Sequence, residues 1–296
     1  MSKLNILPCL DSAELAASRR QELDIPGSVA ATLGRSAVKA AHEGFYISET
    51  GQEVNWHDTV QTACAAKLSI GPDTTLPNQA QTLFHETRVQ VTNETTLGAA
   101  VRLVQSGLRP LALNFASGIH PGGGFLDGAR AQEEALCRSS ALFQTLVNDP
   151  MYEEHRQRPL PDSTDWAIYS PDVPVFRDDN GMALERPWLL SFITCAAPYA
   201  PAIGDAEARD LLQSRILRVL AIARAYGHTV LVLGAWGCGA FGNDPHDTAA
   251  DFRHALETDS AGAFSDIVFA ITDWSPERRY LGPFRDAFTP SNPGLE

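Results

Sequence analysis

The sequence contains few cysteines and no paired cysteine motif. None of its five cysteines forms a Cys-x-x-Cys pair, which is the spacing typical of structural zinc sites. An odd number of cysteines also argues against a framework of disulfide bonds. We therefore expect a protein of a reducing compartment, without a structural metal site.

Long apolar runs are also missing. No run approaches the roughly 20 residues that a membrane-spanning helix needs. The first residues, Met1 to Pro8, lack a hydrophobic stretch long enough for a secretory signal. The sequence therefore predicts a cytoplasmic protein that does not contact membranes.

Runs of Lys and Arg are the third feature that the sequence lacks. The formal net charge is −13, whereas a protein that follows a nucleic-acid backbone usually presents a basic surface. We therefore expect no sequence-specific nucleic-acid partner. An anionic ligand would have to be held by local N–H donors and a few arginines.

The chain is long and apolar enough for a large core. Its 296 residues are 44% hydrophobic, as in ordinary proteins of one or two domains. Residues 11–80 have a helical pattern with breaks, and Ser12 is a candidate N-cap. Gly71-Pro72-Asp73 and Leu76-Pro77-Asn78 then mark a boundary. We predict an N-terminal helical extension over residues 1–80 and a second domain over residues 81–296.

The pattern changes at about residue 83. Short β-branched or apolar runs alternate with helical patterns, as in an α/β domain with a largely buried sheet. Six strands are predicted, at residues 88–92, 111–115, 166–169, 189–194, 229–233 and 267–271. Helices are predicted at residues 95–105, 132–146, 207–226 and 246–257. The proline-rich connection over residues 151–186 is expected to be extended and to close in a turn at residues 178–181.

Three consecutive glycines stand just upstream of two adjacent glutamates. The stretch reads Pro121-Gly122-Gly123-Gly124-Phe125-Leu126-Asp127-Gly128-Ala129-Arg130-Ala131-Gln132-Glu133-Glu134. Glycine lets backbone N–H groups approach a phosphate closely and adopts positive φ. Two carboxylates forced side by side resist ionising together. The combination favours hydrolysis of a glycoside that carries phosphate.

A second glycine-rich segment reads Gly237-Cys238-Gly239-Ala240-Phe241. Like the first, it follows a predicted strand and precedes a predicted helix. Both segments should therefore lie at the carboxyl edge of the sheet, where open α/β folds bind ligands. Backbone N–H groups and a helix N-terminus would then hold a diphosphate from two sides.

The second segment admits two other interpretations. With Gly242 it fits the G-x-G-x-x-G fingerprint of a dinucleotide-binding Rossmann domain, but a single predicted strand follows it. That interpretation also leaves the glycine and glutamate block unexplained. A nucleophilic Cys238 or Cys195 acting with His246 is disfavoured, because no oriented His/Asp partner is evident.

Together the two blocks resemble the bacterial form of the poly(ADP-ribose) glycohydrolases, which have a macrodomain fold. The resemblance includes the glycine triplet and Gln132-Glu133-Glu134, extends from Leu113 to Ser140, and returns from Gly234 to Pro245. It implies an α/β fold with a macrodomain-like mixed central sheet flanked by helices. It also implies hydrolysis of ribose-ribose O-glycosidic bonds in poly(ADP-ribose), without a metal or a cofactor.

The resemblance implies roles for individual residues. Glu134 would be the general acid/base, Glu133 would contact hydroxyls of the scissile ribose, and Gln132 would position the loop or the ligand. Like charge and partial desolvation near Phe125 and Phe241 should raise the pKa of Glu134.

Substrate contacts are expected along both blocks. Phe241 matches an aromatic residue that packs beside the terminal ribose, and Ser117 stands where animal-type enzymes carry asparagine. The expected contacts are Gln132, Gly122, Gly123, Gly124, Phe125, Asn114, Ala116, Ser117, Gly237, Cys238, Gly239, Ala240 and Phe241.

Two other functions share this fold and these loops. One is a macrodomain that binds ADP-ribose without turnover, which the intact Gln132-Glu133-Glu134 argues against. The other is hydrolysis of mono-ADP-ribose attached to a protein or nucleic acid. The expected partners are poly(ADP-ribose) or ADP-ribosylated proteins. The sequence leaves open the oligomeric state and whether cleavage occurs within a chain or at its end.

Overall fold

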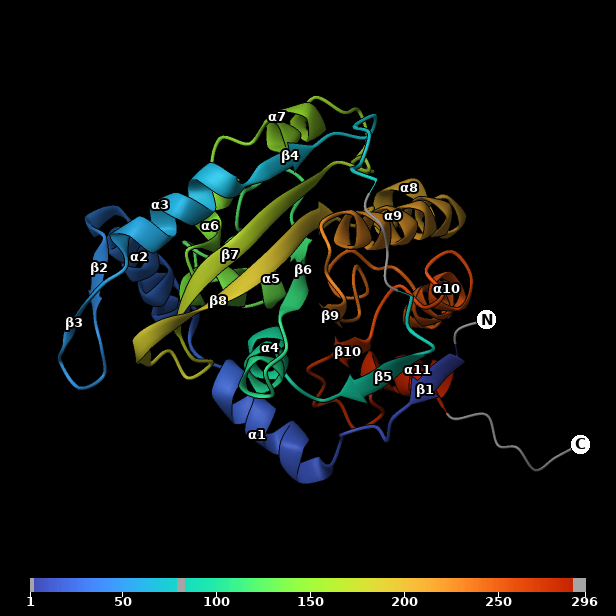
Figure 1. Ribbon diagram of the computed structural model, residues 1–296, viewed down its shortest axis with the longest axis horizontal. Helices are drawn as coiled ribbons and strands as arrows, with labels where there is room; N and C mark the ends of the chain where they lie inside the picture. The colour runs from blue at the N-terminus through green and yellow to red at the C-terminus, as the bar shows by residue number, and fades with distance from the viewer. Residues whose placement is uncertain (1–2, 79–82, 290–296) are drawn as a thin grey trace, which may run out of the picture.

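A computed structural model of the chain describes residues 3–78 and 83–289 and is built on a mixed sheet (Figure 1). In this part of the chain the main sheet has eight strands, in the order β1-β5-β10-β9-β6-β8-β7-β4. Strand β7 pairs antiparallel with β8 and β4, and the other pairs are parallel. The predicted α/β fold with a mixed central sheet is thus confirmed. The strand bounds are β1 (Lys3–Ile6), β4 (Leu68–Ile70), β5 (Glu86–Thr92), β6 (Pro110–Ala116), β7 (Ala167–Arg177), β8 (Ala183–Ala196), β9 (Val230–Leu233) and β10 (Asp266–Ala270).

Helices cover both faces of the sheet. Successive residues of a strand point to opposite faces, and both faces carry apolar side chains that must be buried. In β6, Leu111 and Leu113 point into one core and Ala112 points into the other. The first core is covered by α9 (Asp205–Ala225), α10 (Pro245–Glu257) and α11 (Leu281–Ala287). The second is covered by α2 (Gly27–Glu43), α3 (His57–Ala66), α4 (Thr96–Gln105), α5 (Gln132–Ser139), α6 (Leu142–Leu146) and α7 (Pro150–Arg156). The remaining elements are α1 (Ala13–Leu23), α8 (Ala200–Ile203) and a small hairpin of β2 (Phe45–Ile47) and β3 (Glu53–Asn55).

The predicted helices form, and one of them is broken. Ser12 and Thr95 cap α1 and α4 by accepting hydrogen bonds from Leu15 N and Gly98 N. The helix predicted over residues 132–146 is divided into α5 and α6 at Ser140. Ser140 is extended there, because it bridges to Val175 of β7 while its Oγ accepts from Leu142 N (3.2 Å).

The first eighty residues contribute strands as well as helices. We predicted a helical extension over residues 1–80, but in it β1 pairs with β5 and β4 pairs with β7. Strands of three or four residues are too short to give a clear alternating pattern, which is why they escaped prediction. The expected boundary between residues 80 and 81 lies outside the described residues.

The long connection after residue 150 forms α7 and then one arm of a hairpin. Strands β7 and β8 extend well beyond the predicted runs, and the predicted turn closes at Asp178, where Gly181 N donates to Asp178 O (3.1 Å).

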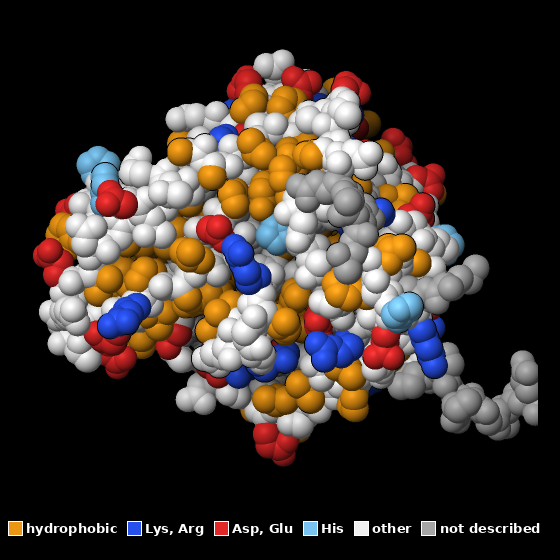
Figure 2. Space-filling view, viewed as in Figure 1, with side chains coloured by type: hydrophobic (Ala, Val, Ile, Leu, Met, Phe, Trp, Pro, Cys, Tyr) orange, Lys and Arg blue, Asp and Glu red, His pale blue; other side chains and the backbone are white. Residues whose placement is uncertain are grey.

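None of the helices in residues 3–78 and 83–289 has the length and apolar composition needed to cross a membrane. On the face shown in Figure 2, Lys and Arg side chains are scattered and do not gather into one basic area.

A buried carboxylate joins the edge strand β4 to α7. The side chain of Asp149 is fully buried, and it accepts hydrogen bonds from Lys67 Nζ, Ser69 Oγ (2.8 Å) and Met151 N (3.1 Å). Three donors, at the end of α3, in β4 and in α7, compensate the cost of burying this charge.

We therefore expect Asp149→Ala to lower the free energy of unfolding in urea by about 3 kcal/mol, because it leaves Lys67 without its buried partner. The matched control is Glu257→Ala, which removes an exposed i,i+4 partner of Arg253. It should change the free energy of unfolding by no more than about 0.5 kcal/mol. Equal losses of unfolding free energy in the two variants would contradict a stabilising role for buried Asp149.

Candidate active site

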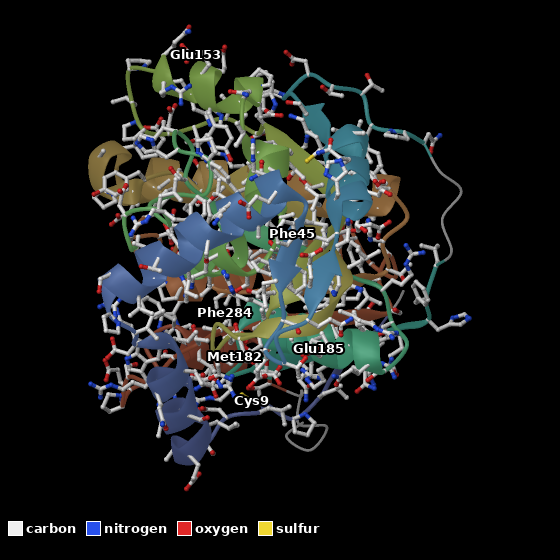
Figure 3. The ribbon with its side chains drawn as sticks, turned by 90° about the vertical axis from the view of Figure 1, so that its left-hand side faces the viewer. Cys9, Phe45, Glu153, Met182, Glu185 and Phe284 are labelled. Carbon is white, nitrogen blue, oxygen red and sulfur yellow. The ribbon has the colours of Figure 1, made fainter. Side chains whose placement is uncertain are left out.

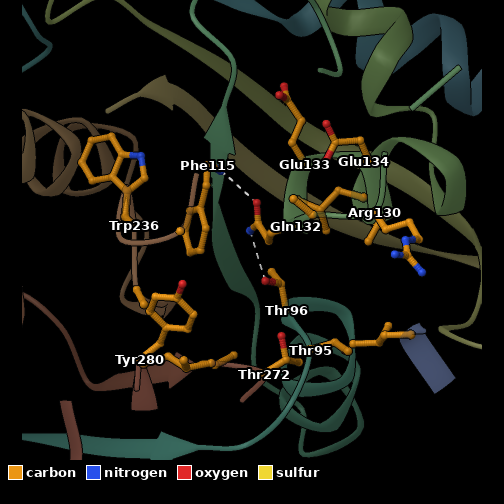
Figure 4. A pocket seen from close by; sticks show the side chains of 18 of the residues that line it. Thr95, Thr96, Phe115, Arg130, Gln132, Glu133, Glu134, Trp236, Thr272 and Tyr280 are labelled. Atoms are coloured by element: carbon orange, nitrogen blue, oxygen red, sulfur yellow. Dashed lines mark hydrogen bonds between the residues drawn. The ribbon is translucent and has the colours of Figure 1, made fainter. Parts of the chain in front are cut away.

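A cavity of about 530 Å³ lies where the parallel strands end (Figure 4). Its wall is built from residues at or just after the carboxyl ends of β5, β6, β8, β9 and β10. Both glycine segments follow strands of this edge, which is the arrangement that the sequence predicted. In Figure 4, Glu133 and Glu134 lie at the opposite end of the cavity from Thr272 and Tyr280.

Glu133 is buried at the cavity wall with both carboxyl oxygens engaged. Its Oε2 accepts from Ser117 N (2.7 Å), and its Oε1 accepts from Asn114 Nδ2 (3.3 Å). Burial raises the pKa of Glu133 to about 8, against the hydrogen bond from Ser117, and the charge of Glu134 adds to the rise. Burial thus favours the protonated form of Glu133.

Glu134 lies beside it and has one oxygen engaged. Its Oε1 accepts from Gly124 N (2.9 Å). Within the described residues, its buried Oε2 has no hydrogen-bond partner. Glu134 belongs to the cavity wall, so the carboxylate oxygen that lacks a partner is on a residue of that wall.

The glycine triplet makes room for the two carboxylates. A Cβ added to Gly123 would lie 2.2 Å from Glu134 Oε1 and 3.1 Å from Glu133 Oε2. Gly123 also has φ +59°, in the left-handed region that favours glycine. Gly122 likewise has positive φ and lies against the ring of Phe125. The glycines thus form a cover over the carboxylates and supply the Gly124 N–H.

Gln132 holds the start of α5 against two other elements. Its Oε1 accepts from Phe115 N (2.9 Å), and its Nε2 donates to Leu113 O (2.7 Å) and Thr96 Oγ1 (3.1 Å). Figure 4 shows Gln132 between Phe115 and Thr96. The side chain therefore aligns α5 with β6 and α4, which places both glutamates at the first turn of the helix.

The second glycine segment presents backbone donors to the same cavity. Gly237, Gly239, Ala240 and Phe241 belong to the wall, and Gly237 has φ +78°. Asn243 fixes the loop, because its Nδ2 donates to Pro198 O (2.9 Å) and Gly237 O (3.1 Å). Among the described residues, no acceptor meets the N–H groups of Gly239, Ala240 and Phe241. They are free to bind an anion.

The charge of the wall is mostly negative. Arg130 is the single Lys or Arg among the described wall residues, and its guanidinium pairs with Asp24 (2.8 Å). The carboxylates of the wall belong to Asp24, Glu94, Glu133, Glu134 and Asp179. In the described ranges, no group of three or more His, Cys, Asp or Glu side chains could hold a metal ion. An anionic ligand would depend on backbone N–H groups here.

Six of the thirteen expected contact residues lie outside the cavity wall: Asn114, Gly122, Gly123, Gly124, Phe125 and Cys238. Phe125 packs against Phe143, with ring centroids 4.8 Å apart, and Asn114 bridges Glu133 and Thr194. Cys238 lies beneath its loop, and burial raises the pKa of its thiol to about 12. A protonated thiol is a poor nucleophile, which argues against a cysteine mechanism.

The structure adds wall residues that the motifs did not indicate. Asp179, from the turn between β7 and β8, accepts from Thr95 Oγ1 (2.6 Å), and burial raises its pKa. Trp274 and Tyr280 follow β10. The segments after β5 and β10 could have been found from their position after predicted strands, since all parallel strands end at this edge. Asp179 comes from a distant hairpin turn and carries no such signal.

The segment before the glycine triplet is held by a buried histidine of α7. His155 Nε2 accepts from Thr164 N (3.1 Å), so the ring proton is on Nδ1 and is donated to Gly118 O (3.0 Å). Burial lowers the pKa of His155 to about 4. The neutral ring therefore belongs to the folded state.

This geometry predicts a pH dependence of stability. His155 has a folded pKa of about 4, below its ordinary value of 6.5, so the unfolded chain binds the proton first. The stabilisation is complete above pH 6.5 and is lost as the pH falls towards 4. We expect urea unfolding to show a larger loss of stability between pH 7.5 and pH 4.5 in the wild type than in His155→Gln. The same pH dependence in both proteins would contradict this role.

The chain is similar to proteins of known structure. The catalytic-domain profile of the microbial-type PARG family matches residues 34–178. No curated protein matches the sequence. The crystal structure of poly(ADP-ribose) glycohydrolase (PARG) from Thermomonospora curvata is 40% identical, with 88% of this chain and 99% of that chain covered and a TM-score of 0.83.

Two ligand complexes are also similar. The same T. curvata enzyme bound to the inhibitor ADP-HPD is 40% identical over 88% of this chain and 99% of that chain, with a TM-score of 0.81. The enzyme from Deinococcus radiodurans in complex with ADP-ribose is 38% identical over 77% of this chain and 96% of that chain, with a TM-score of 0.69.

The similarity covers nearly the whole of the solved enzymes, and both glycine segments follow strands of one sheet. It excludes the dinucleotide-binding Rossmann alternative. From the matched fold, the 40% identity and the carboxylate pair beneath the glycine triplet, we conclude that this chain belongs to the microbial-type poly(ADP-ribose) glycohydrolase family of enzymes.

Proposed function

We propose that this protein hydrolyses the ribose-ribose O-glycosidic bonds of poly(ADP-ribose) and releases ADP-ribose, with Glu134 as general acid/base. The observation that carries the proposal is the geometry of Glu134. One carboxyl oxygen is fixed by the Gly124 N–H, and the other is buried at the cavity wall without a partner. The similar enzymes bound to ADP-ribose and to ADP-HPD support a ligand of this class in the cavity.

The reaction needs a proton on the departing ribose oxygen. Cleavage passes through an oxocarbenium-like transition state, and a carboxyl group that protonates the leaving hydroxyl can later deprotonate the attacking water. Burial raises the pKa of Glu133 to about 8, so this part of the wall favours a carboxyl group that holds a proton. We assign its delivery to Glu134, since both oxygens of Glu133 are already held by Asn114 and Ser117.

Glu133 then has a binding role. Held by Asn114 and Ser117, its carboxyl group keeps one orientation and presents hydrogen-bonding positions to hydroxyls of the scissile ribose. Phe241 also belongs to the wall, and its ring makes an edge contact with the ring of Tyr199, with centroids 6.0 Å apart. Together they would hold the ribose against Glu134.

Backbone donors would hold the diphosphate. The free N–H groups of Gly239, Ala240 and Phe241 lie on one side, and the uncapped N-terminus of α5 lies on the other. This arrangement accepts an anion without positive side chains. The partners that follow from it are poly(ADP-ribose) chains or ADP-ribosylated proteins in the cytoplasm.

The test uses Glu134→Gln, which keeps the shape of the side chain and removes the acid. With defined poly(ADP-ribose) as substrate and product separated by chromatography, we expect its rate of ADP-ribose release to fall about 10²–10⁴-fold. Its affinity for ADP-ribose, measured by calorimetry, should stay within about threefold of the wild type.

The matched control is Glu207→Gln, an exposed residue of α9, which should keep wild-type activity. Unchanged turnover in Glu134→Gln would remove this residue from the mechanism. A wild-type protein that leaves polymer intact but releases ADP-ribose from mono-ADP-ribosylated protein would support the alternative hydrolase.

A second prediction concerns the glycine cover. In Gly123→Ala the new Cβ would meet Glu134 Oε1 at 2.2 Å, at a backbone φ of +59°. Either the carboxylate or the loop must move, and we expect at least a 100-fold loss of turnover. Gly71→Ala is the control, because its Cβ would meet its nearest atom at 3.5 Å. Wild-type turnover in Gly123→Ala would show that the carboxylates do not need this cover.

A further inference from the structure

The glycine loop has an inner face towards Glu134 and an outer face towards the N-terminal helices. On the inner face, Gly124 N donates to Glu134 Oε1. On the outer face, Leu126 O accepts from Arg35 Nη1 of α2 (2.9 Å). Figure 3 views the molecule from the side on which α1 and α2 lie, drawn as blue helices in front of the sheet. The loop is thus held between the catalytic carboxylates and α2.

Two contacts bring backbone directly against backbone. A Cβ added to Gly34 of α2 would lie 2.6 Å from Phe125 O. A Cβ added to Gly128 would lie 2.2 Å from Gly27 O, at the first residue of α2. No side chain fits at either point, so α2 limits how far the loop can move away from Glu134.

The junction between α1 and α2 also closes the end of the loop. Arg130 Nη1 donates to Asp24 Oδ1 (2.8 Å) and to Ile25 O (2.7 Å). Leu23, Asp24 and Arg130 all belong to the cavity wall. The N-terminal segment therefore reaches the site itself and contacts the catalytic loop from residue 125 to residue 130.

We propose that α2 and the α1–α2 junction are a positioning element of the active site. They set the distance between the glycine loop and α5, and through it the hydrogen bond from Gly124 to Glu134. This inference rests on the proposed function, in which Glu134 is the acid/base. Arg35 is then a positioning residue, since it acts through the loop and contacts neither the carboxyl group of Glu134 nor the substrate.

A positioning role has a kinetic signature that a stabilising role lacks. Arg35 is exposed, so its removal leaves the core intact. Among the described residues, the second glycine loop makes no backbone hydrogen bond to α2, so we expect the substrate still to bind there. Loss of Arg35 should therefore lower kcat, while KM, the Kd for ADP-ribose and Tm stay close to their wild-type values.

The experiment compares Arg35→Met with Lys39→Met. Lys39 is exposed one turn further along α2 and pairs with Glu43 (3.7 Å), away from the loop. We expect kcat on defined poly(ADP-ribose) to fall about fivefold in Arg35→Met, as for the loss of one hydrogen bond. It should be unchanged in Lys39→Met, and Arg35→Lys should recover at least half of the lost activity.

A second variant tests the closer contact. In Gly34→Ala the Phe125 carbonyl must shift by several tenths of an ångström, because a Cβ at 2.6 Å from it is not tolerated. We expect a loss of kcat greater than tenfold, with ADP-ribose affinity within threefold of the wild type. Thermal unfolding of each variant shows whether the protein assayed is folded.

The outcomes are separable. Wild-type kcat in Arg35→Met and Gly34→Ala, with Glu134→Gln inactive, would overturn the positioning role and leave the proposed function standing. A change confined to KM or to the ADP-ribose affinity, or a loss of kcat that follows the folded fraction, would overturn it as well. An active Glu134→Gln would overturn the proposed function, and this inference with it.

Discussion

The site depends on one hydrogen bond, from the Gly124 N–H to Glu134 Oε1. Two adjacent carboxylates are buried at the first turn of α5, which would be costly without donors. Ser117 and Asn114 serve Glu133, and Gly124 serves Glu134. The Gly124 N–H fixes Oε1 of Glu134, so the position of the glycine loop sets the orientation of this carboxylate. It therefore also sets the position of Oε2, the oxygen that has no partner among the described residues.

Much of this could be read from the sequence, for physical reasons. Five of the six predicted strands form from residues that are mostly apolar or β-branched, as a sheet covered on both faces requires. The strand over residues 88–92 alternates instead, with Val89 and Val91 buried. The order strand, glycine segment, helix places both segments at one edge of the sheet. The adjacency of Glu133 and Glu134 to a glycine triplet points to the carboxylate pair beneath the loop.

The remainder depends on contacts between residues far apart in the chain. Local pattern does not show that β4 adds to β7, because its three residues carry too little periodicity. Nor does it show that Asp179 of a hairpin turn reaches Thr95, or that Gly27 meets Gly128. Phe125 illustrates the same limit: its place beside the glycines suggested a ligand contact, whereas its ring packs inwards against Phe143. Such pairings are decided by tertiary packing.

The scarcity of positive charge in the cavity wall affects which molecules can compete for it. Neutral backbone dipoles attract an anion only at hydrogen-bonding distance, whereas lysines and arginines attract any polyanion from far away. Most of the described side-chain charge in this wall is negative, and its one arginine is paired with Asp24. RNA and DNA would gain little by approaching this surface. Poly(ADP-ribose) is a polyanion too, so this wall attracts neither kind of polymer from a distance. Discrimination between them therefore depends on contacts made at hydrogen-bonding distance, where backbone N–H groups can fit a diphosphate.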